Sequence, residues 1–163
     1  MFQDKLHVPQ RYLPKTLSKR DKEKQRQYLK RSRKLYRQGK YYERPTVSSF
    51  HSRKSRHIHN AEKMYHVENV KPSKILAKRT QCSQQALEKI VNKGRGAYYS
   101  SGSRPNQTAE SWGLARLASA ITGGNASVID YDILRKGCKP TSPALLAATR
   151  LATRQKTRKN HEK

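Results

Sequence analysis

The chain has 163 residues, of which 37 are Lys or Arg and 11 are Asp or Glu, so its formal net charge is +26. Hydrophobic residues make up 33% of the chain, below the roughly 45–50% of a typical globular domain. We therefore expect that the chain cannot order all of itself without a partner. No run of about 18 apolar residues occurs, so we expect no membrane-spanning helix, and no apolar stretch follows Met1, so we expect no secretory signal.

Charge and apolar residues concentrate in different parts of the chain. Residues 1–60 carry 18 Lys or Arg against 4 acids, and residues 139–163 carry 7 against 1, whereas the aliphatic residues and the single Trp cluster between these segments. We predict a mostly α protein with a small helical core at about 72–138. A basic N-terminal arm, residues 1–71, holds one or two docking helices and stays extended when free. A basic C-terminal helix and tail follow at 139–163.

Two helices are predicted in the N-terminal arm. Ser18 is a typical N-cap and Gly39 a typical C-terminal stop, which predicts a helix over Lys19–Gln38. Its apolar residues form a narrow stripe and its other faces are basic, so this helix needs a surface on which to dock. After a linker at 40–52, a second helix is expected over Arg53–His66.

Short helices alternate with breaks in the rest of the chain. The helix that starts near Ser83 is expected to end at Gly94, where a loop rich in Gly, Ser and Tyr begins. Asp130 is expected to cap a short helix, and the only stretch with some strand character is Ala126–Ile129. Ser142 and Pro143 begin the last helix. The predicted helices are 73–80, 83–93, 109–122, 131–136 and 143–156.

The cysteines and histidines do not form a recognisable site. Two cysteines, Cys82 and Cys138, argue against a disulfide scaffold and fit a reducing compartment. Neither they nor His57, His59 and His66 show the paired short spacings of zinc ligands. No set of residues has the pattern of a catalytic site. We therefore expect no enzyme activity, no cofactor and no metal.

The segment Leu76–Ile90 has the pattern of a helix-turn-helix. Small Ala77 lets two helices approach, and Cys82 is the apolar residue after the turn. The pattern departs from the motif at Gln81, where the turn usually has Gly. If the motif is real, four side chains face a DNA major groove, namely Ser83, Gln84, Gln85 and Lys89. The alternative is a helical hairpin that serves only the core.

A second block, from Gly94 to Leu117, is rich in Gly, Ser and Tyr. Its glycines are compatible with an anion-binding nest ahead of a helix, but a compact loop explains them more simply. In that loop Tyr98 and Tyr99 pack against Trp112, and two arginines, Arg104 and Arg116, pair or stack nearby.

Several motifs in these blocks carry a resemblance to a known group of proteins. They are Gly94-x-Gly-Ala-Tyr-Tyr-Ser-Ser-Gly-Ser-Arg-Pro-Asn-Gln-Thr, Ser111-Trp-Gly-x-Ala-Arg, Ala118-Ser-Ala-Ile-Thr-Gly-Gly, Asp130-Tyr-x-Ile-Leu and Gly137-Cys. A looser match lies upstream, at Lys34-Leu-Tyr-x-x-Gly-Lys-Tyr-Tyr and Ser48-Ser-Phe. With these residues the chain resembles an uncharacterised family of small basic proteins of large nucleocytoplasmic DNA viruses.

The resemblance implies a structural virion protein, a minor capsid (cement) protein that bridges capsomers of an icosahedral shell. Its partners would be the major capsid protein and other minor capsid proteins, on the inner surface of a capsid whose parts are made in the host cytoplasm. It supplies no enzymatic residues. We expect the arm to dock through Tyr28, Leu29, Leu35 and Tyr36, and the body to be fixed by Tyr98, Tyr99, Arg104, Trp112 and Arg116.

The alternative is a nucleic-acid-binding protein, either a helix-turn-helix DNA binder or an RNA binder of ribosomal type. A charge of +26 attracts acidic protein surfaces, nucleic acid and the inner-membrane face alike. Composition does not choose among them.

Overall fold

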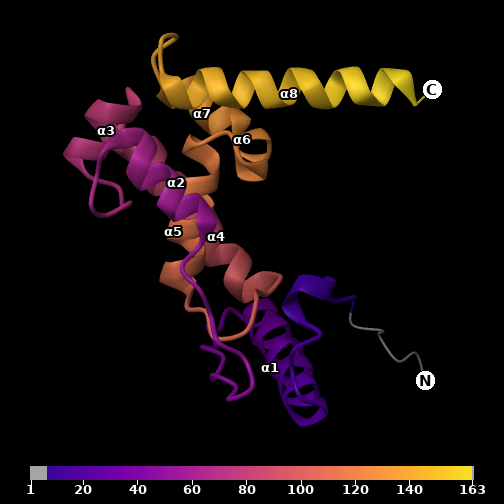
Figure 1. Ribbon diagram of the computed structural model, residues 1–163. Helices are drawn as coiled ribbons and strands as arrows, with labels where there is room; N and C mark the ends of the chain where they lie inside the picture. Colours follow the sequence, from indigo (N-terminus) through magenta and orange to yellow (C-terminus); the bar gives the residue numbers. More distant parts are fainter. Residues whose placement is uncertain (1–6, 163) are drawn as a thin grey trace. The chain divides into compact units, whose positions relative to one another are not determined.

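A computed structural model describes residues 7–162. Within that range the chain forms a 3-10 turn and α-helices with no strand, which confirms a mostly α fold (Figure 1). The elements are η1 (Gln10–Tyr12), α1 (Lys19–Arg37), α2 (Arg56–Tyr65), α3 (Lys74–Thr80), α4 (Gln84–Ser100), α5 (Ala109–Ile121), α6 (Asn125–Ile129), α7 (Tyr131–Gly137) and α8 (Pro143–His161).

The helices belong to two compact units whose boundaries differ from those predicted. The first unit combines the described residues up to Arg53 with Arg95–Trp112, and the second combines Lys54–Gly94 with the described residues from Gly113 onward. The N-terminal segment is thus completed by a distant part of the chain. The C-terminal helix, in turn, belongs to the main helical core.

The second unit holds the larger apolar core. Its fully buried side chains include Leu76, Leu87, Ile90, Leu117 and Leu134. Helix α8 packs on α6 and α7 through the small residues Ala144 and Ala148, and its C-terminal half extends past them (Figure 1). The apolar residues of this unit are few, but short side chains let its helices pack closely.

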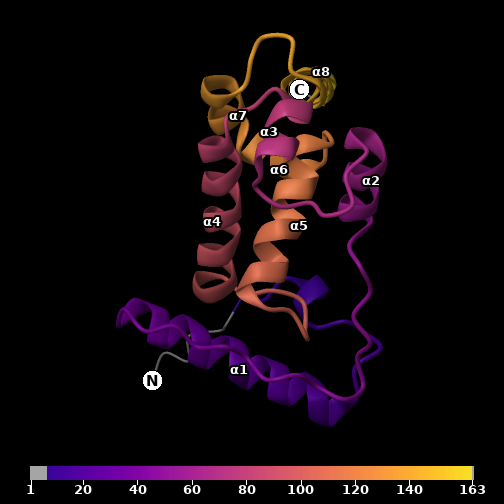
Figure 2. The same cartoon turned by 90° about the vertical axis from the view of Figure 1, so that its left-hand side faces the viewer.

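A pair of glycines lets α4 and α5 run side by side (Figure 2). A Cβ atom on Gly94 would lie 2.6 Å from the Cα atom of Gly113. The prediction that a helix ends at Gly94 is therefore wrong, because this glycine serves a helix contact and α4 continues to Ser100. The predicted loop at 94–107 is correspondingly shorter.

The expected strand at Ala126–Ile129 is also wrong, because these residues belong to the short helix α6. Gly123, with a φ of 74°, ends the preceding helix. The Ser119 hydroxyl then accepts a hydrogen bond from the Ala126 amide at 3.2 Å. This contact fixes the first turn of α6. The alternation of apolar residues that suggested a strand gives no indication of it.

The first unit shows that the N-terminal segment is folded and not extended. Helix α1 starts at the predicted cap, where the Ser18 hydroxyl accepts a hydrogen bond from the Asp21 amide. The Asp21 carboxylate accepts hydrogen bonds from the amide and the hydroxyl of Ser49, which lower the pKa of Asp21. Asn106 holds the same segment by accepting from the Val47 amide at 2.7 Å and donating to the Phe50 carbonyl at 2.7 Å. Hydrogen bonds of polar side chains therefore help to hold this unit together, and the count of apolar residues in the sequence does not reveal them.

A disulfide joins Cys82 to Cys138, contrary to the interpretation of the cysteines from sequence. The pairing brings the end of α7 back to the segment between α3 and α4. Backbone hydrogen bonds flank it, from the Ser83 amide to the Gly137 carbonyl and from the Lys139 amide to the Gln81 carbonyl. Because 56 residues separate the two cysteines, closing this loop in the unfolded chain is worth about 4 kcal/mol on a chain-entropy account.

The glycine contact yields a prediction with an internal control. We expect Gly94→Ala to lower the free energy of unfolding by about 2 kcal/mol, because the added methyl group meets backbone and not a flexible side chain. Gly96 lies in the same helix with nothing within 4 Å of an added Cβ, so Gly96→Ala is expected to raise it by about 0.5–1 kcal/mol through helix propensity. Urea unfolding followed by circular dichroism measures both. A Gly94→Ala protein as stable as the parent would contradict the close helix contact.

Candidate functional site

Helices α3 and α4 are joined by a tight turn at the positions where the sequence pattern places the turn of a helix-turn-helix. Gln81 adopts the left-handed conformation, with φ 57° and ψ 34°, at the position where the motif usually has Gly. The Cys82 amide donates to the Ala77 carbonyl at 3.1 Å and closes the turn. The absence of Gly therefore does not prevent the turn, although a left-handed residue with a side chain carries a cost of about 1–2 kcal/mol.

The side chains of this motif divide as the sequence predicts. Leu76, Cys82, Leu87 and Ile90 are buried, whereas three of the four proposed DNA-facing residues are exposed, namely Ser83, Gln85 and Lys89. Gln84 is half-buried. The Ser83 hydroxyl accepts a hydrogen bond from the Ala86 amide at 3.1 Å, so it also caps α4.

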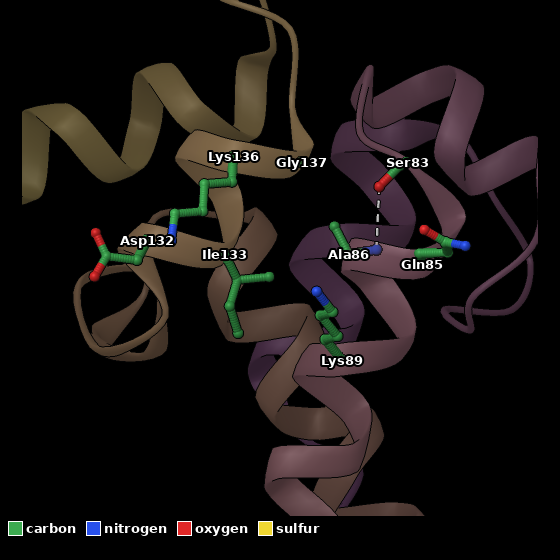
Figure 3. Close-up of a pocket in the computed structure, with 8 residues that line it drawn as sticks. All are labelled: Ser83, Gln85, Ala86, Lys89, Asp132, Ile133, Lys136 and Gly137. Atoms are coloured by element: carbon green, nitrogen blue, oxygen red, sulfur yellow. Dashed lines mark hydrogen bonds between the residues drawn. The ribbon is translucent and has the colours of Figure 1, made fainter.

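A groove of about 300 Å³ lies beside this face of α4 (Figure 3). Its walls come from α4 and α7 and from the residue that caps α4. Two lysines and one carboxylate lie among the lining residues, which are Ser83, Gln85, Ala86, Lys89, Asp132, Ile133, Lys136 and Gly137. Gly137 packs directly on Ala86, so the end of α7 covers part of the first turn of α4. A recognition helix presents this turn to DNA bases, so the neighbouring α7 limits its access to a major groove.

Arg116, which is half-buried, forms an ion pair with a buried carboxylate in the second unit. Its guanidinium donates two hydrogen bonds of 2.8 Å to the carboxylate of Asp130, which is fully buried. Lys93 approaches the same carboxylate at 3.8 Å. The Asp130 carboxylate raises the pKa of Arg116. Asp130 is therefore not a side-chain cap of α7, contrary to the prediction, and Arg116 holds the fold together instead of stacking near the tyrosines.

A buried arginine, Arg44, organises the first unit and was not singled out from the sequence. Its guanidinium donates to the Ser32 hydroxyl at 2.9 Å, the Tyr98 carbonyl at 2.6 Å and the Ser103 hydroxyl at 2.7 Å. It also lies 3.8 Å from the centre of the Tyr98 ring. Burial lowers the pKa of Arg44. A lone arginine in an irregular segment gives no pattern that would reveal such a position.

Four tyrosines form a connected row in the first unit, which we call the tyrosine row: Tyr36, Tyr41, Tyr98 and Tyr99. The ring centres of Tyr98 and Tyr99 are 5.0 Å apart, those of Tyr99 and Tyr41 are 5.0 Å apart, and those of Tyr41 and Tyr36 are 6.3 Å apart. Tyr98 is buried, whereas Tyr41 is 72% exposed. The row therefore leads from the interior of the unit to its surface.

The predicted packing of Tyr98 and Tyr99 against Trp112 is not found. Trp112 meets the edge of Tyr12 instead, with ring centres 6.0 Å apart. Arg104 is exposed. Two of the four residues expected to dock the arm on a partner, Tyr28 and Leu35, are half-buried, and Tyr36 is exposed.

Leu29, the fourth of these docking residues, is fully buried. A Cβ on Gly102 would lie only 2.7 Å from a methyl carbon of Leu29, so this leucine packs inside its own unit. The prediction that Leu29 docks on a partner is therefore wrong.

Two helices carry positive charge that few acids offset. Helix α1 has ten Lys or Arg and two acids, one of which is the buried Asp21. Helix α8 has five Lys or Arg and no Asp or Glu. Among residues 7–162, no group of three potential metal ligands is found, and no helix is long and apolar enough to cross a membrane.

The chain matches the model of a protein family. No curated protein and no solved structure matches the chain. The model of a family of unknown function, DUF5824, matches residues 9–135. This range includes α1 to α6 and most of α7, and α8 lies beyond it. The chain therefore belongs to DUF5824, a family of unknown function.

Proposed function

We propose that the protein is a structural component of a virus particle, a minor capsid protein that joins acidic surfaces of neighbouring capsid proteins. The motifs between Gly94 and Cys138 support this proposal through their resemblance to proteins of large DNA viruses. The observation that carries it is the uncompensated positive charge of α1 and α8.

The two basic helices belong to different units, α1 to the first and α8 to the second. A chain with two separate binding surfaces gains avidity when both are engaged, because the second contact is intramolecular. Each contact is electrostatic, so it is selective for acidic partners and weakens with salt. This arrangement suits a protein that bridges neighbours in a shell.

Helix α8 is the better of the two basic helices to test, because all five of its Lys and Arg residues are exposed. Arg150, Arg154 and Arg158 are exposed and follow one another at intervals of four residues. Such residues lie on one face of a helix. No ion pair is found for them within residues 7–162.

We expect quantitative mass spectrometry of purified particles to find the chain at a fixed ratio to the major capsid protein. Opening the particles and digesting the genome should leave that ratio unchanged. The combined change Arg150→Gln, Arg154→Gln and Arg158→Gln should reduce incorporation severalfold. The matched control, Lys63→Gln, Lys71→Gln and Lys78→Gln, removes the same charge from exposed sites outside both helices and should incorporate normally. Absence of the chain from particles, or its loss with the genome, would contradict the proposal.

The geometry of α3 and α4 favours a second candidate function, sequence-specific DNA binding. Gln81 adopts the left-handed turn conformation of the motif, and Gln85 and Lys89 are exposed beside it. Gln pairs with adenine and Lys contacts guanine or phosphate in known complexes of this type. The contact of α7 with α4 counts against this function.

Selection from a pool of random duplexes tests the second candidate. It predicts that the protein enriches one sequence and that the double change Gln84→Ala and Gln85→Ala removes the preference. Binding to unselected duplex and its salt dependence should stay unchanged, since no charge is altered. A control change of two exposed glutamines, Gln27→Ala and Gln38→Ala, should keep the preference. If the parent protein enriches no sequence, the DNA-reading function is wrong.

A further inference from the structure

The exposed end of the tyrosine row is an unusual surface for so polar a chain. Gly39, with a φ of 75°, reverses the chain after α1, and its amide donates to the Tyr36 carbonyl at 2.9 Å. This reversal returns Tyr41 to the side of Tyr36. Tyr41 is 72% exposed and Tyr36 is 38% exposed. Two aromatic rings are thus displayed together at the surface of the first unit.

The exposed ring of Tyr41 is supported by buried aromatic and cationic groups of the same unit. Tyr41 contacts Tyr99, which contacts the buried Tyr98, and Tyr98 in turn lies under the guanidinium of Arg44. Tyr42, the next residue, is different, because the guanidinium of Arg31 lies 4.8 Å from the centre of its ring. Tyr41 is therefore supported from within and open to a ligand, whereas Tyr42 already has a cation on its ring.

The two open rings have cations next to them in the sequence. Arg37 follows Tyr36 directly and Lys40 precedes Tyr41, and both are exposed. Glu43 is a carboxylate close to the row, because burial first and then the charge of Glu43 raise the pKa of Tyr99. The local balance is therefore positive. Open aromatic rings among cations are the combination by which proteins bind single-stranded nucleic acid.

We propose that Tyr41 and Tyr36 stack on unpaired bases of single-stranded RNA or DNA, while Arg37 and Lys40 contact its phosphates. Stacking on tyrosine tolerates any base, so the site is expected to show little sequence preference. This inference goes beyond the capsid role and does not depend on it. It also does not depend on the helix-turn-helix, which belongs to the second unit.

Other ligands fit this surface less well. A lipid surface would require larger apolar side chains that insert, such as Trp or Phe, whereas the two open rings here are tyrosines. An acidic peptide would satisfy the cations but would leave two open aromatic rings without planar partners. Base-paired nucleic acid offers phosphates alone to this site, because its bases are already stacked. Only an unpaired strand uses both features.

The test has to separate stacking from the general attraction that a charge of +26 exerts on any polyanion. A change that leaves charge untouched does this. Fluorescence anisotropy of the full chain with oligothymidylate of about 12 nucleotides, and with a duplex of equal length, gives the two dissociation constants at several salt concentrations.

We expect Tyr41→Ala to weaken binding of the single strand about tenfold, as for the loss of one stacked base, and to leave duplex binding and the salt slope unchanged. Tyr36→Ala should have a smaller effect of the same kind. Tyr41→Phe keeps the ring and should bind as the parent does, and Tyr42→Ala controls for loss of a tyrosine on the same segment. Because the Tyr41 side chain is mostly exposed, the Tyr41→Ala protein should have the same melting temperature as the parent.

Two results would overturn the stacking site. In one, Tyr41→Ala binds the single strand as tightly as the parent. In the other, the dissociation constants of the Tyr41→Ala protein for the single strand and for the duplex rise by the same factor. The assay uses purified protein alone, so either result leaves incorporation into particles to be decided by its own experiment.

Discussion

The shortage of carboxylates is the constraint on which the rest of the structure depends. With 37 Lys or Arg and 11 Asp or Glu, most cations cannot pair with a carboxylate of the same chain, and the two buried aspartates, Asp21 and Asp130, hold parts of the fold together. Asp130 binds Arg116 and Lys93 inside the second unit. Asp21 fixes the start of α1 to Ser49. Most of the other cations in residues 7–162 are exposed, and this is why every proposed partner is acidic or anionic.

The same shortage shapes the interior of the first unit. Arg44 is buried there with oxygen atoms of Ser32, Tyr98 and Ser103 as acceptors and an aromatic ring beneath it, and no carboxylate contacts it in the described residues. A buried cation is costly unless its donors are satisfied. Here the backbone and hydroxyl acceptors are supplied by segments far apart in sequence. The arginine therefore ties those segments together, and it lets a chain of low apolar content bury a polar face of α1.

Signals confined to a few residues predicted the structure well. Ser18 and Ser142 begin helices as expected, because a cap is a contact between residues three apart. Gly39 ends its helix as expected, with a positive φ angle. The buried positions of the helix-turn-helix pattern were also found, since they follow helical periodicity.

Features that depend on distant residues could not be predicted from the sequence. Gly94 resembles a helix stop until Gly113 is placed against it. The disulfide partner of Cys82 lies 56 residues away, and Leu29 is covered by chain near Gly102. The place of Tyr41 in a row of aromatic rings depends on its contacts with Tyr36 and Tyr99, and the contact with Tyr99 is distant in sequence. Each error arose where a local pattern was interpreted without the segment that folds against it.

The central claim is that both units fold through their own contacts and then present their surplus charge to a partner. Hydrogen exchange of the isolated monomer, at moderate salt and without any polyanion, tests it most directly. We predict slow exchange for backbone amides of α1 around Gln25 and Leu29, comparable with those of α4 around Leu87 and Ile90, since all four side chains are buried. Exchange of the α1 amides at the rate of an unfolded chain, with protection appearing only when a polyanion is added, would contradict the account.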